Sequence, residues 1–102
     1  MATVSGSTLS GSFTSATQSD DIIISGPSLY QVDGFGTATV ALQGNSGDGW
    51  VTLKLGDDST DASFTADRIG VVGFPGVNMA VRFNCTAYTS GTITYRLAKG
   101  TG

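Results

Sequence analysis

The stretch VNMAVRFNCTAYTSGTITYRLA, residues 77–98, has the most regular pattern in this sequence. Apolar and polar residues alternate strictly in it, a period of two that is typical of a β-strand with one buried face. Two such runs, 77–86 and 92–97, flank the segment YTSG (residues 88–91), whose Ser and Gly favour a turn. The pattern predicts a β-hairpin, with Arg82 and Arg96 on its outer side, near each other or near Asp side chains. The residues expected to face the core are Val77, Met79, Val81, Phe83, Cys85, Ile93, Tyr95 and Leu97.

The whole chain is rich in small and hydroxylic residues and poor in charge. Its 102 residues include 15 Gly, 14 Thr and 12 Ser, and only 13% are charged, about half of the roughly 25% usual for soluble proteins. Thr favours strands through its branched Cβ atom, whereas Gly and Ser favour turns. Length and composition together predict one all-β domain with many turns.

Turn signals recur along the chain at the short intervals typical of sandwiches and barrels. Alternating segments between them predict strands at 22–25, 28–32, 37–43, 50–55, 62–66 and 70–74. In the segment 50–55, Val51, Leu53 and Leu55 are expected to face the core and Trp50 to face outward. We therefore expect a single-domain, antiparallel two-sheet sandwich with about seven to nine strands, of jelly-roll or immunoglobulin-like topology.

The first 19 residues carry no charged side chain and consist almost entirely of Ser, Thr, Gly and Ala. This composition predicts a flexible or extended N-terminal arm at residues 1–19, ahead of a β-sandwich domain at residues 20–102. Leu9 and Phe13 show a weak period of two, which indicates a short strand, and we expect them to contact a neighbouring subunit. The alternative is a frayed terminus without a function.

The residue inventory offers little for catalysis. Histidine is absent, which removes the most common general base and the usual partner of a nucleophilic Ser or Cys. Cys85, the only cysteine, falls at an apolar strand position and is expected to fill the core. The eight acidic residues are all Asp and lie mostly beside Gly, Ser or Thr, where carboxylates bond the local backbone of turns. We expect no enzyme activity, no catalytic residues and no cofactor.

One loop has the composition of a cation site. The segment GDDSTD (residues 56–61) brings together three carboxylates, and calcium prefers such oxygen-rich sites. The spacing of an EF-hand loop is not met, so a solvated turn is the simpler interpretation. Asp57, Asp58 and Asp61 are therefore weak calcium candidates in a chain for which we otherwise expect no metal.

Charge and aromatic residues narrow the range of partners. The net charge is −3 and the five basic residues are scattered, so we expect no nucleic acid, and no segment suits a membrane. Trp50 and Tyr88 fall outside the inward positions and are expected to contact a partner subunit or to stack on a sugar. A strand-rich domain with few charged residues at its edges risks edge-to-edge aggregation, and assembly with copies of itself or into a lattice removes that risk.

The stretch GDGWVTLKLGDDSTDASFTADRIGVVGFPGV (residues 47–77) and the closing segment 78–100 resemble the small virion proteins of tailed bacteriophages. Those proteins pair a DG-W hairpin and an FTA strand with a final hairpin of the form R-x-x-x-TAYTSGT. The resemblance covers residues 34–99, and the first third of the chain matches no motif.

The resemblance implies a structural β-sandwich protein of the virion, most similar to capsid decoration, or cement, proteins. Such proteins bind the major capsid protein as homotrimers on the outer surface of the shell, in particles assembled in the host cytoplasm. They hold neighbouring capsid subunits together against the pressure of packaged DNA. A structural protein of the phage tail or head-tail connector is one alternative. A carbohydrate- or receptor-binding β-sandwich module is the other.

Overall fold

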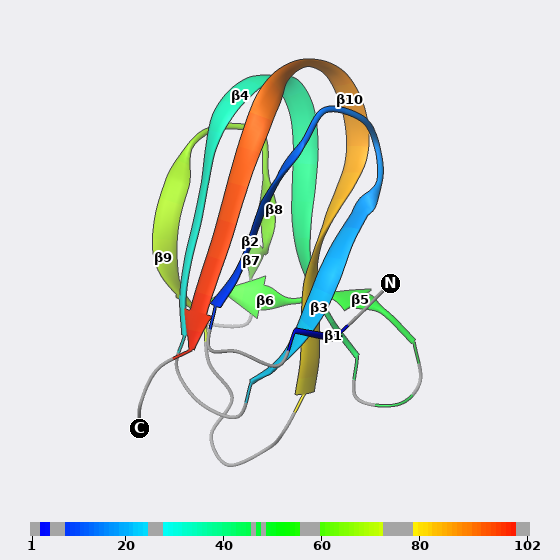
Figure 1. Ribbon diagram of the computed structural model, residues 1–102, viewed down its shortest axis with the longest axis vertical. Helices are drawn as coiled ribbons and strands as arrows, with labels where there is room; N and C mark the ends of the chain where they lie inside the picture. Colours follow the sequence, from blue (N-terminus) through cyan, green and yellow to red (C-terminus); the bar gives the residue numbers. More distant parts are fainter. Residues whose placement is uncertain are drawn as a thin grey trace.

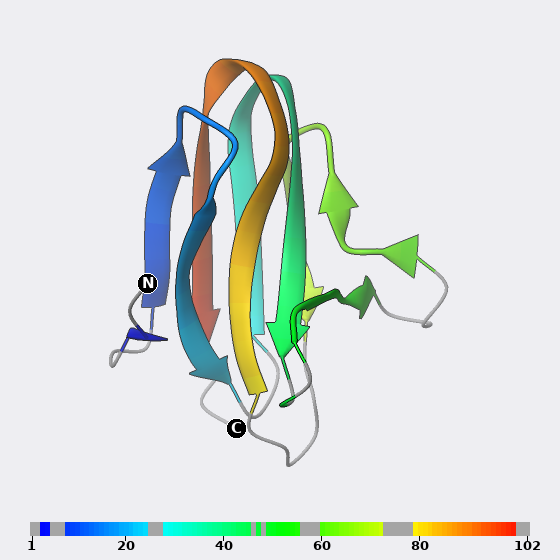
Figure 2. The same ribbon diagram turned by 90° about the vertical axis from the view of Figure 1, so that its right-hand side faces the viewer.

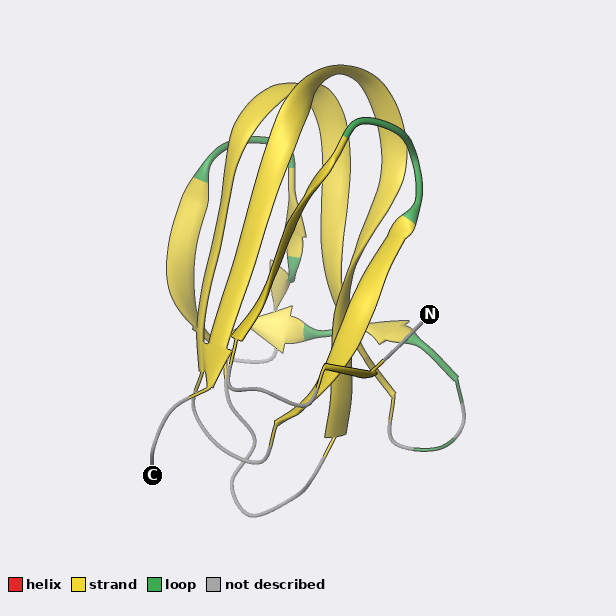
Figure 3. Cartoon of the chain, in the orientation of Figure 1, coloured by secondary structure: helices red, strands yellow, loops and turns green. Residues whose placement is uncertain are grey.

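The computed structural model describes residues 3–4, 8–24, 28–45, 47, 49–55, 60–72 and 79–99. All regular elements in these ranges are strands, so the prediction of an all-β domain is confirmed (Figure 3). No helix long and apolar enough to span a bilayer occurs in the same ranges. The strands are β1 (Thr3–Val4), β2 (Thr8–Phe13), β3 (Gln18–Ile24), β4 (Ser28–Asn45), β5 (Val51–Thr52), β6 (Lys54–Leu55), β7 (Thr60–Asp61), β8 (Ser63–Phe64), β9 (Arg68–Val72) and β10 (Met79–Lys99).

Two long strands organise the fold. β4 spans 18 residues and β10 spans 21, and the two pair antiparallel along almost their whole length. Both bend over midway and form the double arch at the top of Figure 1. The register shifts at several points between Cys85 and Thr94, and Gly34 and Gly91 there have φ angles of 78° and 106°, which glycine adopts at no steric cost. Each long strand therefore has two arms, one on each side of the bend: 28–33 and 37–45 in β4, 79–87 and 92–99 in β10.

The predicted hairpin is wrong in its pairing, although its inward positions are largely right. Its two runs do not pair with each other, because Cys85 pairs with Val40 on β4 and Ile93 pairs with Phe13 on β2. Residues 88–91 are the bend of one continuous strand, since β4 follows β10 through the arch and supplies pairing partners on both sides. Met79 is half-buried, and Val77 lies outside the described residues. The buried positions of β10 are Val81, Phe83, Cys85, Ile93, Tyr95 and Leu97.

The other strands pair with these four arms. On one side of the arch, β3 joins the first arm of β10, and β5 and β8 join the second arm of β4. On the other side, β2 joins the second arm of β10, and β9 joins the first arm of β4. β1 pairs parallel with β3, whereas the other described pairs are antiparallel. The result is an eight-stranded sheet, beside which β6 and β7 form a separate pair.

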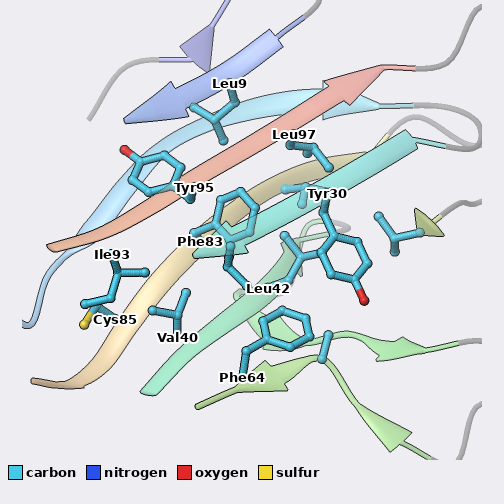
Figure 4. Packing of buried hydrophobic residues seen from close by; sticks show 14 of the residues in the cluster. Leu9, Tyr30, Val40, Leu42, Phe64, Phe83, Cys85, Ile93, Tyr95 and Leu97 are labelled. Atoms are coloured by element: carbon cyan, nitrogen blue, oxygen red, sulfur yellow. The ribbon is translucent and has the colours of Figure 1, made fainter. Parts of the chain in front are cut away.

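The hydrophobic core receives side chains from strands on both sides of the arch (Figure 4). Aromatic rings connect them: the ring centroids of Phe83 and Tyr95 lie 5.1 Å apart and those of Phe13 and Tyr95 lie 4.7 Å apart. Tyr30 stacks on Phe64 at 5.2 Å. Phe83 and Tyr95 belong to different arms of β10, so this contact ties the two arms together. Contacts of this geometry stabilise by about 0.5–1.5 kcal/mol beyond the area that they bury.

The described residues of the N-terminal region are part of the fold, since Thr3–Val4 pairs with β3 and Thr8–Phe13 pairs with β10. Thr8–Phe13 is strand β2, and Leu9 and Phe13 are only 2% and 1% exposed, so they belong to the core of this chain and not to a contact with a neighbour. Residues 8–19 therefore do not form a flexible or extended arm, although the region has little charge and many small residues. The Tyr95 ring lies over position 11 and leaves no room for a side chain there. A Cβ atom at Gly11 would meet Tyr95 Cζ at 2.8 Å. The structure does not describe residues 1, 2 and 5–7.

The segment between β4 and β9 leaves the sheet and returns to it. β5 pairs with β4 at Gln43, the β6–β7 pair projects from the sheet, and β8 rejoins β4 at Val40 (Figure 2, green segments at the right). Leu53 lies between β5 and β6. Its backbone N–H donates to the Leu42 carbonyl oxygen, with an N–O distance of 3.0 Å. The expected alternation in 50–55 fails at this point: Leu53 packs on the core, but Val51 is 68% exposed.

The buried Cys85 and Tyr95 predict a loss of stability at alkaline pH. Burial raises the pKa of the Cys85 thiol, and burial together with the charge of Asp20 raises the pKa of the Tyr95 hydroxyl. A raised pKa means that the folded state keeps a proton which the unfolded state releases. The free energy of unfolding should therefore be unaffected by these groups at neutral pH and should fall as pH rises above about 9.

Urea unfolding at a series of pH values from 7 to 10.5 measures this effect. Tyr95→Phe keeps the ring and removes the ionisable hydroxyl, so the decline should be shallower in that variant. A free energy of unfolding that rises between pH 9 and 10.5 would contradict the assignment.

Candidate functional site

A cluster of polar side chains around Trp50 and Arg82 lies on the outer face of the sheet. Arg82, on the first arm of β10, is the register partner of Asp21 on β3 and of Gln43 on β4, so these three side chains form a row across three strands. The Arg82 guanidinium lies over the Trp50 ring, with Cζ 4.2 Å from the ring centroid. We call Gln18, Asp21, Gln43, Trp50, Arg82 and Asn84 the Trp50–Arg82 cluster. Arg82 therefore lies near an Asp side chain, as one of the two expected alternatives had it, whereas Arg96 pairs with Ser10 on β2 and Gln31 on β4.

Hydrogen bonds between side chains hold this cluster across the strands. Gln43 Oε1 accepts from Arg82 Nε at 3.2 Å and from Asn84 Nδ2 at 3.3 Å. Gln18 Nε2 donates to Asn84 Oδ1 at 3.4 Å, which extends the row to β3. The side chains therefore reinforce the pairing of β3, β10 and β4 in addition to the backbone ladder.

The charged side chains of the Trp50–Arg82 cluster are the cation Arg82 and the acid Asp21. Burial lowers the pKa of the Arg82 guanidinium, and the negative charge of Asp21 opposes that shift. Asp21 Oδ1 is buried and has no hydrogen-bond partner within the described chain. Because the Arg82 guanidinium covers one face of the Trp50 ring, that face is closed to a sugar or a partner side chain. A cation–π contact of this kind stabilises by about 0.5–1 kcal/mol when exposed and more when desolvated.

Tyr88, the second aromatic candidate, is half-buried in the arch. Its hydroxyl donates to the Gly91 carbonyl at 2.6 Å, and its ring packs against the core cluster. Tyr88 also lines an open hollow of about 240 Å³, together with Gly36, Ala38, Ala87 and the threonines Thr37, Thr39, Thr65 and Thr89. Tyr88 therefore fixes the bend of its own strand, and the expectation that it contacts a partner subunit is not needed to explain its position.

An apolar patch lies on the other side of the arch, at the sheet edge formed by β9. Leu29 on β4 is 41% exposed, and Ile69 and Val71 on β9 are 59% and 64% exposed. Leu29 and Val71 are register partners, so the three side chains are neighbours on one outward face. We call these three residues the β9 patch. Next to it, a hollow of about 300 Å³ is lined by Gln31, Val32, Asp33, Asp67, Arg68 and Ile69.

The calcium loop falls mostly outside the described structure. Asp57 and Asp58 belong to the residues that the structure does not describe, and Asp61 is an exposed residue at the end of β7. Within the described ranges, no three His, Cys, Asp or Glu side chains gather in a way that could hold a metal ion. The calcium hypothesis for Asp57, Asp58 and Asp61 stays a prediction.

The sequence identified Trp50 as a candidate residue, but neither the Trp50–Arg82 cluster nor the β9 patch was predicted from it. Trp50 and Arg82 are 32 residues apart, and the cluster comes together through the pairing of β10 with β3 and β4 and through the pairing of β5, which follows Trp50, with β4. Ile69 and Val71 alternate with Arg68 and Gly70, which is the same period as a strand with a buried apolar face. The pattern alone does not say whether that face points into the core or outward.

The comparisons with known proteins do not identify this chain, because no family model, no curated protein and no solved structure matches it.

Proposed function

We propose that this chain is a structural protein of a virion, which decorates and stabilises a bacteriophage capsid by binding to the outer shell as an oligomer. The observation that carries the oligomeric part of the proposal is the β9 patch, because Ile69 and Val71 lie on the outward face of an edge strand. Exposed apolar edges of this kind serve contact with another protein chain. The resemblance of residues 34–99 to small virion proteins is the reason for choosing a phage shell.

We also propose that the arched sheet is a two-sheet sandwich, of jelly-roll or immunoglobulin-like topology. One sheet would contain β3, the first arm of β10 and the second arm of β4, and the other would contain β2, the second arm of β10, the first arm of β4 and β9. The core side chains that come from both sets support this division, as does the passage of β4 and β10 from one set to the other.

The mechanism that we propose is adhesion at several points. Each contact with the major capsid protein is weak, but the copies in an oligomer, expected to be a homotrimer, bind together at a high effective concentration. Low charge suits this role. The chain has only five basic and eight acidic residues, so a contact surface includes few charged side chains that must be desolvated or paired.

Capsid shells of the encoding phage, prepared without this chain, provide the test. Purified chain should bind to their outer surface in a fixed ratio to the major capsid protein, as seen by cryo-electron microscopy. On heating, decorated shells filled with DNA should release the DNA at a higher temperature than undecorated shells filled with DNA. A chain that binds only to tails or head-tail connectors, or to no particle, would overturn the assignment to the shell.

The glycan-binding alternative has a separate readout in the same protein. Trp50 would have to stack on a sugar, but Arg82 already covers one face of its ring. We expect no binding on a glycan array. Binding that Trp50→Ala abolishes and that Val51→Ala, a change at an exposed neighbouring position, leaves intact would contradict the structural role.

A further inference from the structure

The β9 strand is an edge of the sheet. Its five residues pair antiparallel with β4, from Ser28 opposite Val72 to Val32 opposite Arg68. No residue of the described ranges pairs with β9 on its other side, where it forms the outer border in Figure 1. The backbone N–H and C=O groups on that side are a template for one more strand.

Exposed apolar side chains of the described ranges gather at this edge. The described residues include five large apolar side chains that are well exposed, namely Ile23, Leu29, Val51, Ile69 and Val71. Three of the five make up the β9 patch. Water contact of such a grouped patch is unfavourable, and its burial would stabilise by roughly 25 cal/mol for each Å² of apolar surface.

We propose that β9 pairs antiparallel with β9 of a second copy of this chain, around a two-fold axis at Gly70. In this register Ile69 lies opposite Val71 of the second copy, and Val71 opposite its Ile69, all on the outward face. Leu29 of each copy continues the row, because it is the register partner of Val71. The β9 patches of both copies then form one apolar stripe across a continuous sheet.

Charge disfavours two other registers that keep side chains on matching faces. An axis at Ile69 would place Asp67 opposite Val71, and an axis at Arg68 would place the two Arg68 side chains opposite each other, which is destabilising. The axis at Gly70 places Arg68 opposite Val72 and keeps the two cations apart. Gly70 also suits the centre, because Tyr30 fills its core side: a Cβ atom there would meet the Tyr30 hydroxyl at 2.7 Å.

The area that the β9 contact can bury limits the affinity of the pair. Stable interfaces bury about 800 Å² on each partner, and three side chains and a five-residue edge supply less than that. The free pair is therefore weak, and it becomes effective when each copy is also held on a shell. This inference rests on the proposed function, and it names the surface through which decorating copies contact one another.

Sedimentation velocity of the full chain from micromolar to millimolar concentration tests the proposal, with native mass spectrometry to count subunits. As concentration rises, the two-fold β9 contact should join the units present in pairs, so that monomers form dimers and the expected homotrimers associate further into hexamers. Val71→Lys should weaken the association at least tenfold. Val51→Lys, a matched change on an equally exposed valine outside the β9 patch, should change it by less than twofold.

Cysteine pairs test the register. Cα atoms of opposite residues in an antiparallel pair lie about 4.5–5.5 Å apart, within the range of a disulfide, whereas diagonal neighbours lie beyond it. The double variant Ile69→Cys with Val71→Cys should oxidise to a covalent dimer, and neither single variant should. Cys85 is 2% exposed and should not interfere.

The outcomes separate this inference from the proposed function. A wild type that stays monomeric at millimolar concentration, a trimer that associates no further, or association that Val71→Lys leaves intact would each overturn the β9 contact. Binding to shells would still support the decoration role in all three cases. Shell binding is measured independently, and its absence would overturn the decoration role even if β9 pairs form.

Discussion

Replacing Phe83 with alanine is expected to lower the free energy of unfolding by about 3–5 kcal/mol. Phe83 is fully buried, and its ring contacts that of Tyr95, which belongs to the other arm of β10. The change removes an aromatic side chain from the centre of the core and leaves a cavity between the arms. For a domain of this size each kcal/mol corresponds to roughly 4–8 °C, so Tm should fall by at least about 12 °C.

Thermal and urea unfolding followed by circular dichroism measure this loss. Val51→Ala is the matched control, because Val51 is 68% exposed and its truncation should cost less than about 0.5 kcal/mol. A Phe83→Ala variant that loses under about 1 kcal/mol would mean that the two arms of β10 do not pack against each other.

The arch predicts a second large effect, at Gly91. Its φ angle of 106° is unfavourable for any residue with a Cβ atom, and such a backbone conformation costs of order 1–3 kcal/mol. A Cβ atom there would also overlap the backbone nitrogen of Gly36 on the adjoining part of β4. Gly91→Ala should therefore lower the free energy of unfolding by roughly 2–5 kcal/mol, since both costs apply.

Gly49 provides a control that separates the two costs. It has nearly the same φ angle, 111°, but nothing lies within 4 Å of the position of a Cβ atom. Gly49→Ala should cost about 1–2 kcal/mol, and the difference between the two variants measures how closely β4 and β10 approach in the arch. Equal costs in urea unfolding would mean that the two strands separate at the bend.

Local sequence patterns predicted the strands and their inward positions better than their pairing. The alternation in β10 identified Phe83, Cys85, Ile93 and Tyr95 as core residues, because a half-buried strand keeps a period of two wherever it pairs. The Thr-Ser-Gly segment has the composition of a hairpin turn and also of a bend. Which of these forms depends on β4, whose residues are far away in the sequence.

Long-range contacts also explain the other differences. Leu9 and Phe13 are surrounded by Ser, Thr and Gly, so their segment lacks the composition of a core strand, and only its pairing with β10 buries them. Trp50 and Arg82 meet because neighbouring strands bring them together. Ile69 and Val71 have the alternation of a buried strand, but that face points outward. A period of two gives two faces without saying which one the rest of the chain covers.

Amide hydrogen exchange at low and high protein concentration is the most direct test of the claim that this chain works by joining its β9 edge to another copy. We expect the amides of residues 68–72 that point away from β4 to exchange more slowly as concentration rises from micromolar to millimolar, because new inter-strand hydrogen bonds protect them. Amides of β3, which lies on the other side of the arch, should exchange at the same rate throughout. Exchange in residues 68–72 that is independent of concentration over this range would contradict the account.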